Sequence, residues 1–493
     1  MKLILNGHDE RYIVEQSLMN LLPGEKPVYE PILPEDDSWA VISLNEENDL
    51  CSVTTELHLQ GKTITKEHTC TLSGTDYEKV GQRRHAVAVC FFLAVQGLTG
   101  CTPPWGMLTG VRPDKPVTAA LARGQSPQQA LALLEQSYFV TPERAALALE
   151  TGALALEAAR GLDARDIAVY VGIPFCPTRC SYCSFVSQSV ERDFSLVNPY
   201  VDALVAEIRA GGRMVKEQGL RCRAFYMGGG TPTTLTAEQM DRVLTAFEES
   251  FDLADCREIT VEAGRPDTIT AEKLAVLRAH NVTRVSVNPQ TMEDHVLRAI
   301  GRRHSAGDIE AAMELVAKYN FPHVNMDLIA GLPEDSPEGF RRSLDRCLSF
   351  GTDNVTVHTL ALKKGSRILL EGLSIPGAEA VSEMVDYASA TLRRAGYSPY
   401  YLYRQKYMSG SFENVGWHSG GAECWYNIYI MSELCSILSF GAGGSTKMVE
   451  FGTNHIERVF NPKYPREYTE RPEKLLANQA AFASFYTSLK GDK

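Results

Sequence analysis

Short apolar runs alternate with longer segments of helical periodicity from residue 167 to about residue 396. The apolar runs are rich in β-branched residues and are too short for helices, which predicts buried strands. A repeated order of strand, loop and helix predicts parallel strands joined by crossover helices. The six predicted strands are residues 167–173, 224–227, 258–263, 284–288, 323–329 and 354–360.

The segments between these strands begin at residues that favour helix N-termini, among them Thr236, Thr270, Ser305 and Ser336. Six strand–helix units are fewer than the eight of a closed TIM barrel. We therefore predict an α/β fold with an open, partial (β/α)6 barrel, whose chemistry lies on the loops after the strands. The predicted helices are residues 200–217, 237–249, 271–280, 306–319 and 337–350.

The two ends of the chain do not show this repeat. Residues 1–164 combine short β-like runs with helical patterns at 77–98 and 127–160, and predict an α+β domain of unknown role. Residues 165–396 form the predicted barrel domain, and residues 397–493 a C-terminal extension. The β-like runs near the N-terminus are residues 2–6, 39–44, 53–59 and 62–69.

Composition and charge narrow the class of protein. The chain has 493 residues, 44% of them hydrophobic and 22% charged, which supports several buried cores. Its net charge of −12 repels phosphate backbones and argues against a nucleic-acid partner. No export signal stands at the N-terminus and no apolar stretch is long enough to cross a bilayer. We therefore expect a cytoplasmic protein without a membrane partner.

Three of the twelve cysteines crowd onto one loop after the first predicted barrel strand. Cys176, Cys180 and Cys183 form a C-x3-C-x2-C motif, and thiolates suit iron–sulfur clusters or zinc. Three close ligands underfill a tetrahedral zinc site, but they fit a cubane cluster with one iron open to another ligand. We predict a [4Fe-4S] cluster. The alternatives are a structural zinc ion with a distant fourth ligand, and disulfides.

A glycine-rich loop, Gly228-Gly-Gly-Thr-Pro-Thr233, follows the second strand. Glycines let a ligand approach the backbone closely, and free N–H and C=O groups can bind an amino acid. Polar side chains then stand at or just beyond successive strand ends. Hydrogen bonds inside the barrel or surface ion pairs would explain any one of them, but four in strand order favour a binding site. These four residues are Glu262, Gln290, Arg302 and Asp327.

The cysteine motif, the preceding Tyr170-Val-Gly-Ile-Pro-Phe175 and the glycine-rich loop resemble the signature of radical S-adenosylmethionine (SAM) enzymes. More narrowly, the chain resembles the oxygen-independent coproporphyrinogen III dehydrogenase (HemN-like) family, in its HemZ-type branch with a long N-terminal extension. The family resemblance covers residues from about 165 to 460. The branch resemblance extends through residues 103–113 and 403–417.

The resemblance implies two cofactors, a [4Fe-4S] cluster on the three cysteines and SAM. Glu262 would accept from the SAM ammonium, and Arg302 would pair with the SAM carboxylate. Gln290 and Asp327 would hold the ribose hydroxyls, and the backbone of Ala361 would contact adenine. The positions that match SAM contacts of the family are Tyr170, Gly229, Gly230, Thr231, Glu262, Gln290, Arg302, Asp327 and Ala361.

The resemblance also implies an activity. Reductive cleavage of SAM would yield a 5′-deoxyadenosyl radical, which starts the oxidative decarboxylation of coproporphyrinogen III propionates to vinyl groups in haem biosynthesis. This chemistry implies a tetrapyrrole substrate and a low-potential electron donor such as flavodoxin or ferredoxin. Tyr170 would face the SAM or substrate pocket and is the candidate catalytic residue; a core tyrosine is the alternative.

Two positions depart from the dehydrogenase pattern. The family's dehydrogenases carry a further cysteine and a histidine where this chain has Phe185 and Gly172. Haem chaperones of the family share the phenylalanine, so a haem-binding or haem-transfer protein is a second hypothesis. Those chaperones have a His-Asn pair where this chain has Glu413-Asn414, and a carboxylate is a poorer haem ligand than imidazole. Radical SAM chemistry on another tetrapyrrole is the third hypothesis.

Overall fold

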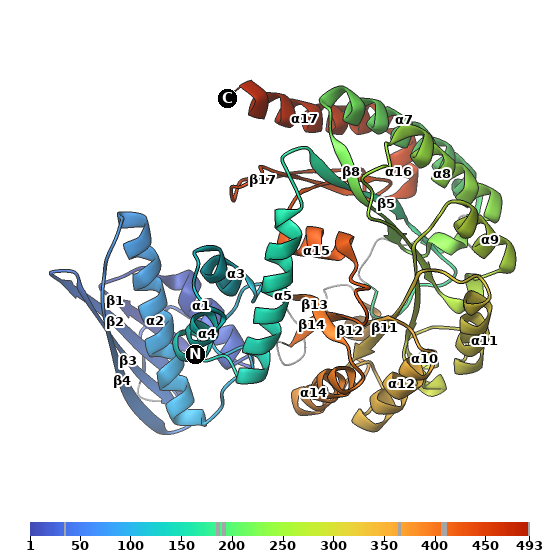
Figure 1. Ribbon diagram of the computed structural model, residues 1–493. Helices are drawn as coiled ribbons and strands as arrows, with labels where there is room; N and C mark the ends of the chain where they lie inside the picture. Colours follow the sequence, from blue (N-terminus) through green and yellow to red (C-terminus); the bar gives the residue numbers. More distant parts are fainter. Residues whose placement is uncertain (34–35, 184–187, 190–193, 363–365, 406–411, 492–493) are drawn as a thin grey trace. The chain divides into compact units, whose positions relative to one another are not determined.

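The computed structural model describes residues 1–33, 36–183, 188–189, 194–362, 366–405 and 412–491 (Figure 1). Contacts within the chain divide it into two compact units, residues 1–149 and residues 150–493. The boundary falls within helix α5 (Pro142–Arg160). In the described part of the chain, no helix is long and apolar enough to cross a membrane.

The first unit is built on a four-stranded sheet in the order β1-β2-β3-β4. Helix α2 (Asp76–Thr99) begins with a capping box in which Thr75 and Glu78 bond each other's backbone amides. Apolar residues of α2 share a core with the sheet and with helix α1 (Arg11–Leu21). The strands are β1 (Lys2–Asn6), β2 (Ser38–Glu47), β3 (Leu50–Leu59) and β4 (Lys62–Thr71).

Two parts of the first unit differ from the sequence prediction. Helix α1 was not predicted, because its N-cap, Glu10, makes no side-chain capping bond and gives no start signal. The helical pattern predicted over 127–160 is wrong as a continuous helix, because Pro142 lacks the N–H that a helix interior needs. The segment forms α4 (Pro127–Ala132), a π-helical turn (Leu133–Ser137) and α5; helix α3 (Lys115–Ala122) precedes it.

The second unit is built on an eleven-stranded sheet. Six neighbouring strands, in the order β12-β11-β10-β9-β8-β5, run parallel to one another. Each coincides with one predicted strand, apart from small differences at the ends. This arrangement confirms the open (β/α)6 barrel. The strands are β5 (Asp166–Ile173), β8 (Arg221–Gly229), β9 (Glu258–Gly264), β10 (Arg284–Gln290), β11 (His323–Ala330) and β12 (Asn354–Thr359).

Helices that connect these strands line the outer side of the curved sheet (Figure 1). The predicted cap residues Thr236, Thr270, Ser305 and Ser336 each accept a backbone N–H of the first helical turn. These bonds satisfy amides that the helix leaves unpaired, and so set where each helix begins. The helices are α7 (Val197–Gln218), α8 (Ala237–Ser250), α9 (Ala271–Ala279), α10 (Asp294–Ala299), α11 (Ala306–Ala317), α12 (Pro337–Ser349), α13 (Arg367–Glu371) and α14 (Ala378–Arg394).

Residues 397–493 extend the same sheet at both of its edges. Strand β14 pairs antiparallel with β12 and carries β13, while β15 pairs parallel with β5 and carries β16 and β17. Helix α15 lies on the inner side of the curve (Figure 1). These elements are β13 (Ser398–Arg404), β14 (Glu413–His418), α15 (Trp425–Ser432), β15 (Ser436–Phe440), β16 (Ser445–Val449), β17 (Ile456–Phe460), α16 (Pro465–Glu470) and α17 (Pro472–Gly491).

A buried carboxylate joins the C-terminal segment to helix α7. Glu207 accepts hydrogen bonds from the amide of Gly441 (2.8 Å), the hydroxyl of Tyr468 (2.6 Å) and the side-chain amide of Asn461 (2.7 Å). Burial raises the pKa of Glu207 to about 7, although these hydrogen bonds act in the opposite direction. The group is therefore partly protonated near neutral pH.

We predict that titration of Glu207 makes the fold less stable as the pH rises from about 4.5 to about 7. The folded pKa lies above the unfolded one, so the native state holds the proton more tightly and loses that advantage as the pH rises. Glu207→Gln cannot titrate and should lack this component, about 2 to 3 kcal/mol. Urea unfolding of both proteins at the two ends of this range measures it. The same pH dependence in both would contradict the assignment.

Candidate functional site

The three motif cysteines lie on one loop at the C-terminal end of β5. Cys176 ends the short strand β6 (Phe175–Cys176); Cys176 and Cys180 are buried and Cys183 is half-buried. The amide of Cys183 donates to the carbonyl of Cys180 (3.2 Å), which turns the loop between them. None of the twelve cysteines of the chain is in a disulfide, so the disulfide alternative is wrong.

Within the described residues, no three side chains of His, Cys, Asp or Glu converge on a point where they could hold one metal ion. The single-zinc alternative therefore has no ligand set in that part of the chain. A cubane places different demands on the loop, because each thiolate binds a different iron and the ligands need not meet at one point.

The glycine-rich loop after β8 is bonded directly to the cysteine loop. The amide of Gly230 donates to the carbonyl of Ile173 (2.7 Å), and the amide of Thr231 donates to the carbonyl of Phe175 (2.8 Å). The hydroxyl of Thr231 also donates to Sγ of Cys176 (3.5 Å). The two motifs, which are distant in sequence, therefore form one continuous surface.

Glycines let the backbone of this loop approach its neighbours more closely than residues with side chains could. A Cβ at Gly230 would lie 3.0 Å from Sγ of Cys176 and 2.6 Å from the carbonyl of Phe175. A Cβ at Gly228 would lie 3.0 Å from the carboxylate of Glu262. Gly229 has a φ of 110°, which side chains rarely adopt, and its Cβ would face the hydroxyl of Tyr170 at 3.4 Å. The glycines thus let the loop backbone pass close to Cys176, Tyr170 and Glu262, and we call the surface that these residues border the cradle.

Glu262, near the end of β9, is the carboxylate of this cradle. The hydroxyl of Tyr226 donates to its Oε1 (2.6 Å). Burial raises the pKa of Glu262 to about 7; the nearby charge of Asp327 adds to this effect, while the Tyr226 bond and His358 oppose it. The structure therefore brings Glu262 and Asp327 close enough to interact.

Tyr226 is a site residue that the sequence reasoning missed. Its ring stacks on Tyr426 of α15 (4.7 Å between centroids) and lies near Tyr170 (6.3 Å). Alternation along β8 puts Tyr226 on the same face as Gly228, two residues later. That alternation is the sequence signal that could have identified it. The stacked rings pack in the barrel interior beside Glu262, which is half-buried.

Asp327 belongs to a hydrogen-bonded network that joins β10 and β11. It accepts from the side-chain amide of Asn325 (2.8 Å), which also donates to Ser286 (2.7 Å). Nε2 of His358, on β12, lies 3.8 Å from the other carboxylate oxygen. Asp327 is therefore oriented by its neighbours and remains half-buried at the carboxyl ends of the strands.

Arg302 is buried and faces the cysteine loop. It donates to the carbonyl of Asn288 (2.5 Å) and to the hydroxyl of Tyr182 (3.2 Å), which lies between two of the cysteines. Burial alone would lower the pKa of Arg302, but Tyr182 and Cys180 raise it above its ordinary value. The guanidinium is therefore charged.

Gln290 and Ala361 stand at the same sheet edge as these residues. Gln290 ends β10, is buried, and has a φ of 71°, a strained backbone conformation that is common at functional sites. Ala361 follows β12 and is half-buried. Phe185, one of the two departures from the dehydrogenase pattern, lies outside the described residues. Gly172, the other, sits in β5, and a side chain there would contact Tyr170 and the carbonyl of Phe440.

The Radical SAM superfamily sequence model matches residues 170–347. Over 446 residues the chain is 38% identical to the oxygen-independent coproporphyrinogen-III oxidase-like protein HemZ of Bacillus subtilis, covering 89% of each chain. This chain belongs to the HemN-like radical SAM family, in its HemZ-type branch. It is also 30% identical to the heme chaperone HemW of Mycobacterium tuberculosis over 61% of this chain and 73% of the relative.

The structure gives the same picture of the fold. Coproporphyrinogen III oxidase HemN of Escherichia coli, described as a radical SAM enzyme, matches with a TM-score of 0.50 at 23% identity. The match covers 65% of this chain and 72% of that one. Members of the HemN-like radical SAM family use a [4Fe-4S] cluster and SAM. The residues present here fit both, with three cysteines outside any disulfide on one loop and, beside Cys176, a glycine backbone that a Cβ at Gly230 would obstruct.

We predict that Cys176→Ala, Cys180→Ala or Cys183→Ala removes the cluster, because three thiolates are the whole ligand set on this loop. Iron and acid-labile sulfide after anaerobic reconstitution measure the loss, together with 5′-deoxyadenosine formed from SAM. Cys101→Ala, at an exposed cysteine of the first unit, is the control and should load normally. Full iron content and turnover in a motif variant would refute the assignment.

We also predict that SAM binds more tightly as the pH rises through about 7. Glu262 must lose its proton to accept from the SAM ammonium, and its raised pKa places that change near neutrality. Glu262→Gln should bind SAM about tenfold or more weakly above this pH, the loss of a charged hydrogen bond, and its affinity should no longer follow that titration. Equilibrium dialysis with the reconstituted protein tests this. An unchanged pH profile in the variant would remove Glu262 from the site.

Proposed function

We propose that the protein is a radical SAM oxidoreductase that decarboxylates the propionates of coproporphyrinogen III to vinyl groups without oxygen, forming protoporphyrinogen IX. One observation carries this proposal. The cysteine loop, the glycine cradle and Glu262 form a single site, in which Thr231 donates to Cys176 and Gly228 adjoins Glu262. The names of the HemZ relative and of the HemN structure indicate the substrate class.

The chain's own residues bind and orient the cofactors in this proposal. The cluster and SAM, when bound, supply the chemistry of hydrogen-atom abstraction. The cysteines hold the cluster, and the backbone of Gly229 and Gly230 binds the amino-acid part of SAM next to it. Glu262 accepts from the ammonium and is oriented by Tyr226. The remaining SAM contacts are Thr231, Arg302 to the carboxylate, Gln290 and Asp327 to the ribose, and Ala361 to adenine.

Tyr170 is the proposed residue on the substrate side of the cradle. Its hydroxyl faces Gly229, and its ring lies near Tyr226 and Tyr426, with 6.1 Å between the ring centroids of Tyr170 and Tyr426. The environment raises the pKa of Tyr170, first through burial and then through the charge of Glu262, so the phenol stays protonated. We propose that Tyr170 shields the reacting carbon from water and donates a hydrogen bond.

Haem binding or transfer is the second candidate, which the HemW relatives favour. The position of the chaperones' His-Asn pair argues against it. Asn414 accepts from the amide of Thr359 (2.9 Å) and donates to the carbonyl of Tyr403 (3.2 Å). Glu413 is buried opposite Arg404 in the β13–β14 pair. The side chain of Asn414 is therefore bonded to the backbone of the sheet, and the carboxylate of Glu413 would bind haem iron less well than an imidazole.

Two partners follow from the proposed reaction. The substrate is a tetrapyrrole with several propionates, and each propionate that is converted to a vinyl group loses a hydrogen atom, carbon dioxide and one electron. Reduction of the cluster requires a low-potential donor such as flavodoxin or ferredoxin. Radical SAM chemistry on another tetrapyrrole would need the same two partners, so product analysis distinguishes the substrates.

We predict that the reconstituted protein, with SAM, a reductant and coproporphyrinogen III under anaerobic conditions, forms the vinyl product and 5′-deoxyadenosine. Chromatography with mass detection measures both, and Cys180→Ala is the inactive control. If SAM is cleaved only when another tetrapyrrole is supplied, that tetrapyrrole would replace coproporphyrinogen III as the assigned substrate. Stoichiometric haem uptake without any product would contradict the proposed reaction and favour the chaperone.

A further inference from the structure

A buried arginine donates hydrogen bonds to the middle of the cysteine loop. Arg265 lies just beyond β9 and is 2% exposed. Its Nη1 donates to the hydroxyl of Thr178 (2.6 Å) and to the carbonyl of Thr178 (3.2 Å). Thr178 stands between Cys176 and Cys180, so these bonds act on the part of the loop that spaces two of the thiols.

Asp267 locks the arginine in this orientation. Nε of Arg265 donates to Oδ1 of Asp267 (3.0 Å) and Nη2 donates to Oδ2 (2.9 Å). This two-point contact fixes the plane of the guanidinium, so its remaining nitrogen points at Thr178. Burial opposes ionisation of Asp267, but His304 and Arg265 lower its pKa below the ordinary value. The carboxylate is therefore charged.

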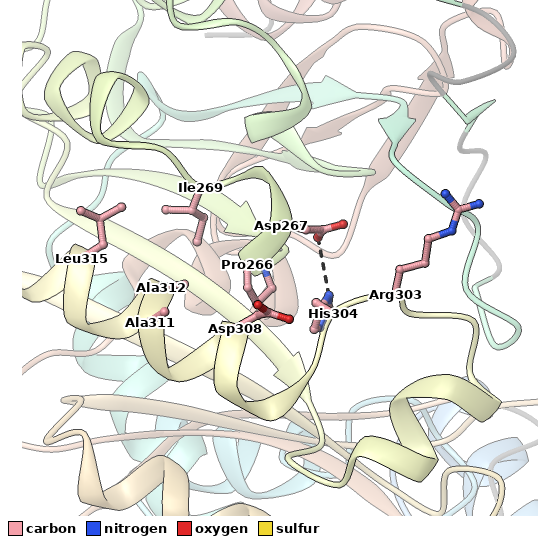
Figure 2. Close-up of a pocket in the computed structure, with 9 residues that line it drawn as sticks. All are labelled: Pro266, Asp267, Ile269, Arg303, His304, Asp308, Ala311, Ala312 and Leu315. Atoms are coloured by element: carbon pink, nitrogen blue, oxygen red, sulfur yellow. Dashed lines mark ion pairs between the residues drawn. The ribbon is translucent and has the colours of Figure 1, made fainter.

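His304 supports Asp267 from the other side. Figure 2 shows Asp267 and His304 facing each other among the residues that line a pocket beside helix α11. Nδ1 of His304 lies 3.5 Å from the carboxylate of Asp267. None of the residues that line this pocket belongs to the SAM cradle, so this support comes from outside the cradle.

A third loop is also hydrogen-bonded to the cysteine loop. We call the contacts of Arg265, Gly301 and Ile300 with Thr178 and Ser181 the bracket. The hydroxyl of Thr178 donates to the carbonyl of Gly301 (3.1 Å), and the amide of Ser181 donates to the carbonyl of Ile300 (3.0 Å). The loops that follow β5, β9 and β10 are thereby tied together at Thr178. The conformation of the cysteine loop is fixed by protein contacts on both sides of Cys180.

We infer that Arg265, held by Asp267, is a positioning residue that keeps the cysteine loop in its ligand-binding conformation and slows loss of the cluster. All three of its nitrogens are engaged by Asp267 and Thr178, so it acts through the loop. These charge-assisted bonds are partly buried, and removing the guanidinium takes its donors away from Thr178 and from Asp267, whose contact with His304 remains. The loop then opens more readily and exposes iron. This inference goes beyond the proposed reaction, because it concerns retention of the cluster without substrate.

The test is a chelator challenge of the reconstituted protein under anaerobic conditions. Arg265→Gln should load iron and sulfide but lose iron to EDTA about tenfold faster than wild type, and Arg265→Lys should lie between them. The EPR signal of the reduced cluster should also change in Arg265→Gln. Arg209→Gln, at an exposed arginine that pairs with Glu249, is the matched control and should release iron at the wild-type rate.

Thr178→Val tests the same bracket from the loop side without changing a charge. It should also speed iron loss, and adding it to Arg265→Gln should have little further effect, because both remove the same bond. Wild-type iron loss in Arg265→Gln, or additive effects in the double variant, would overturn the inference. If Arg265→Gln does not fold, the rate of iron loss from Thr178→Val decides whether the inference holds. A wild-type protein that takes up no cluster would instead overturn the proposed function.

Discussion

The parallel pairing of β5 with β8 is the constraint on which the site depends. Its register places Gly172 opposite Gly228 and Ile173 opposite Gly229. Parallel strands end at the same edge of a sheet, so the cysteine loop after β5 and the glycine loop after β8 must meet. A slip of one residue would turn Tyr170 and Tyr226 to the other face and remove the walls of the cradle. The hydrogen bonds from Gly230 and Thr231 to the cysteine loop extend this register beyond the strands.

The interior of the barrel sets the electrostatics of this edge. Tyrosines from β5, β8, β13 and α15 occupy the space inside the curved sheet, and Tyr226 is bonded to Glu262. Few water molecules fit among packed rings, so charges interact strongly and an unpaired charge is costly. Glu262 accordingly has a pKa near neutrality until a cation arrives. Asp267 shows the opposite case, because its cationic partner, Arg265, is already in place.

Local signals made most of the barrel predictable from the sequence. The six strands are short β-rich runs, and the side chains of Thr236 and Ser305 cap helices where the sequence places their starts. The cysteine and glycine motifs were identified because their residue types and spacing are themselves chemical requirements. Glu262 and Asp327 followed from their positions near strand ends; Arg302, which was predicted with them, lies after helix α10 instead. The residues that these side chains contact could not be predicted from the sequence. Their orientations, and the pKa shifts of Glu262 and Arg302, were therefore not predictable either.

The parts that sequence reasoning missed depend on contacts between distant segments. Tyr226 resembles any core tyrosine until Glu262, on the next strand, is placed beside it. Arg265 resembles a surface charge until the strand order brings it to Thr178. The strands after residue 397 add to both edges of the sheet, which their own short runs do not reveal. Pro142 shows the reverse error, because a helical composition concealed a local break.

The central claim is that SAM binds at a cluster on the cysteine loop, in the cradle between Cys176 and Glu262. The most direct measurement is the EPR spectrum of the reduced, reconstituted protein with and without SAM. The account predicts a [4Fe-4S] signal whose g-values change when SAM is added, because SAM occupies the open iron beside the glycine loop. A cluster signal that SAM leaves unchanged, at concentrations where binding is saturated, would contradict it.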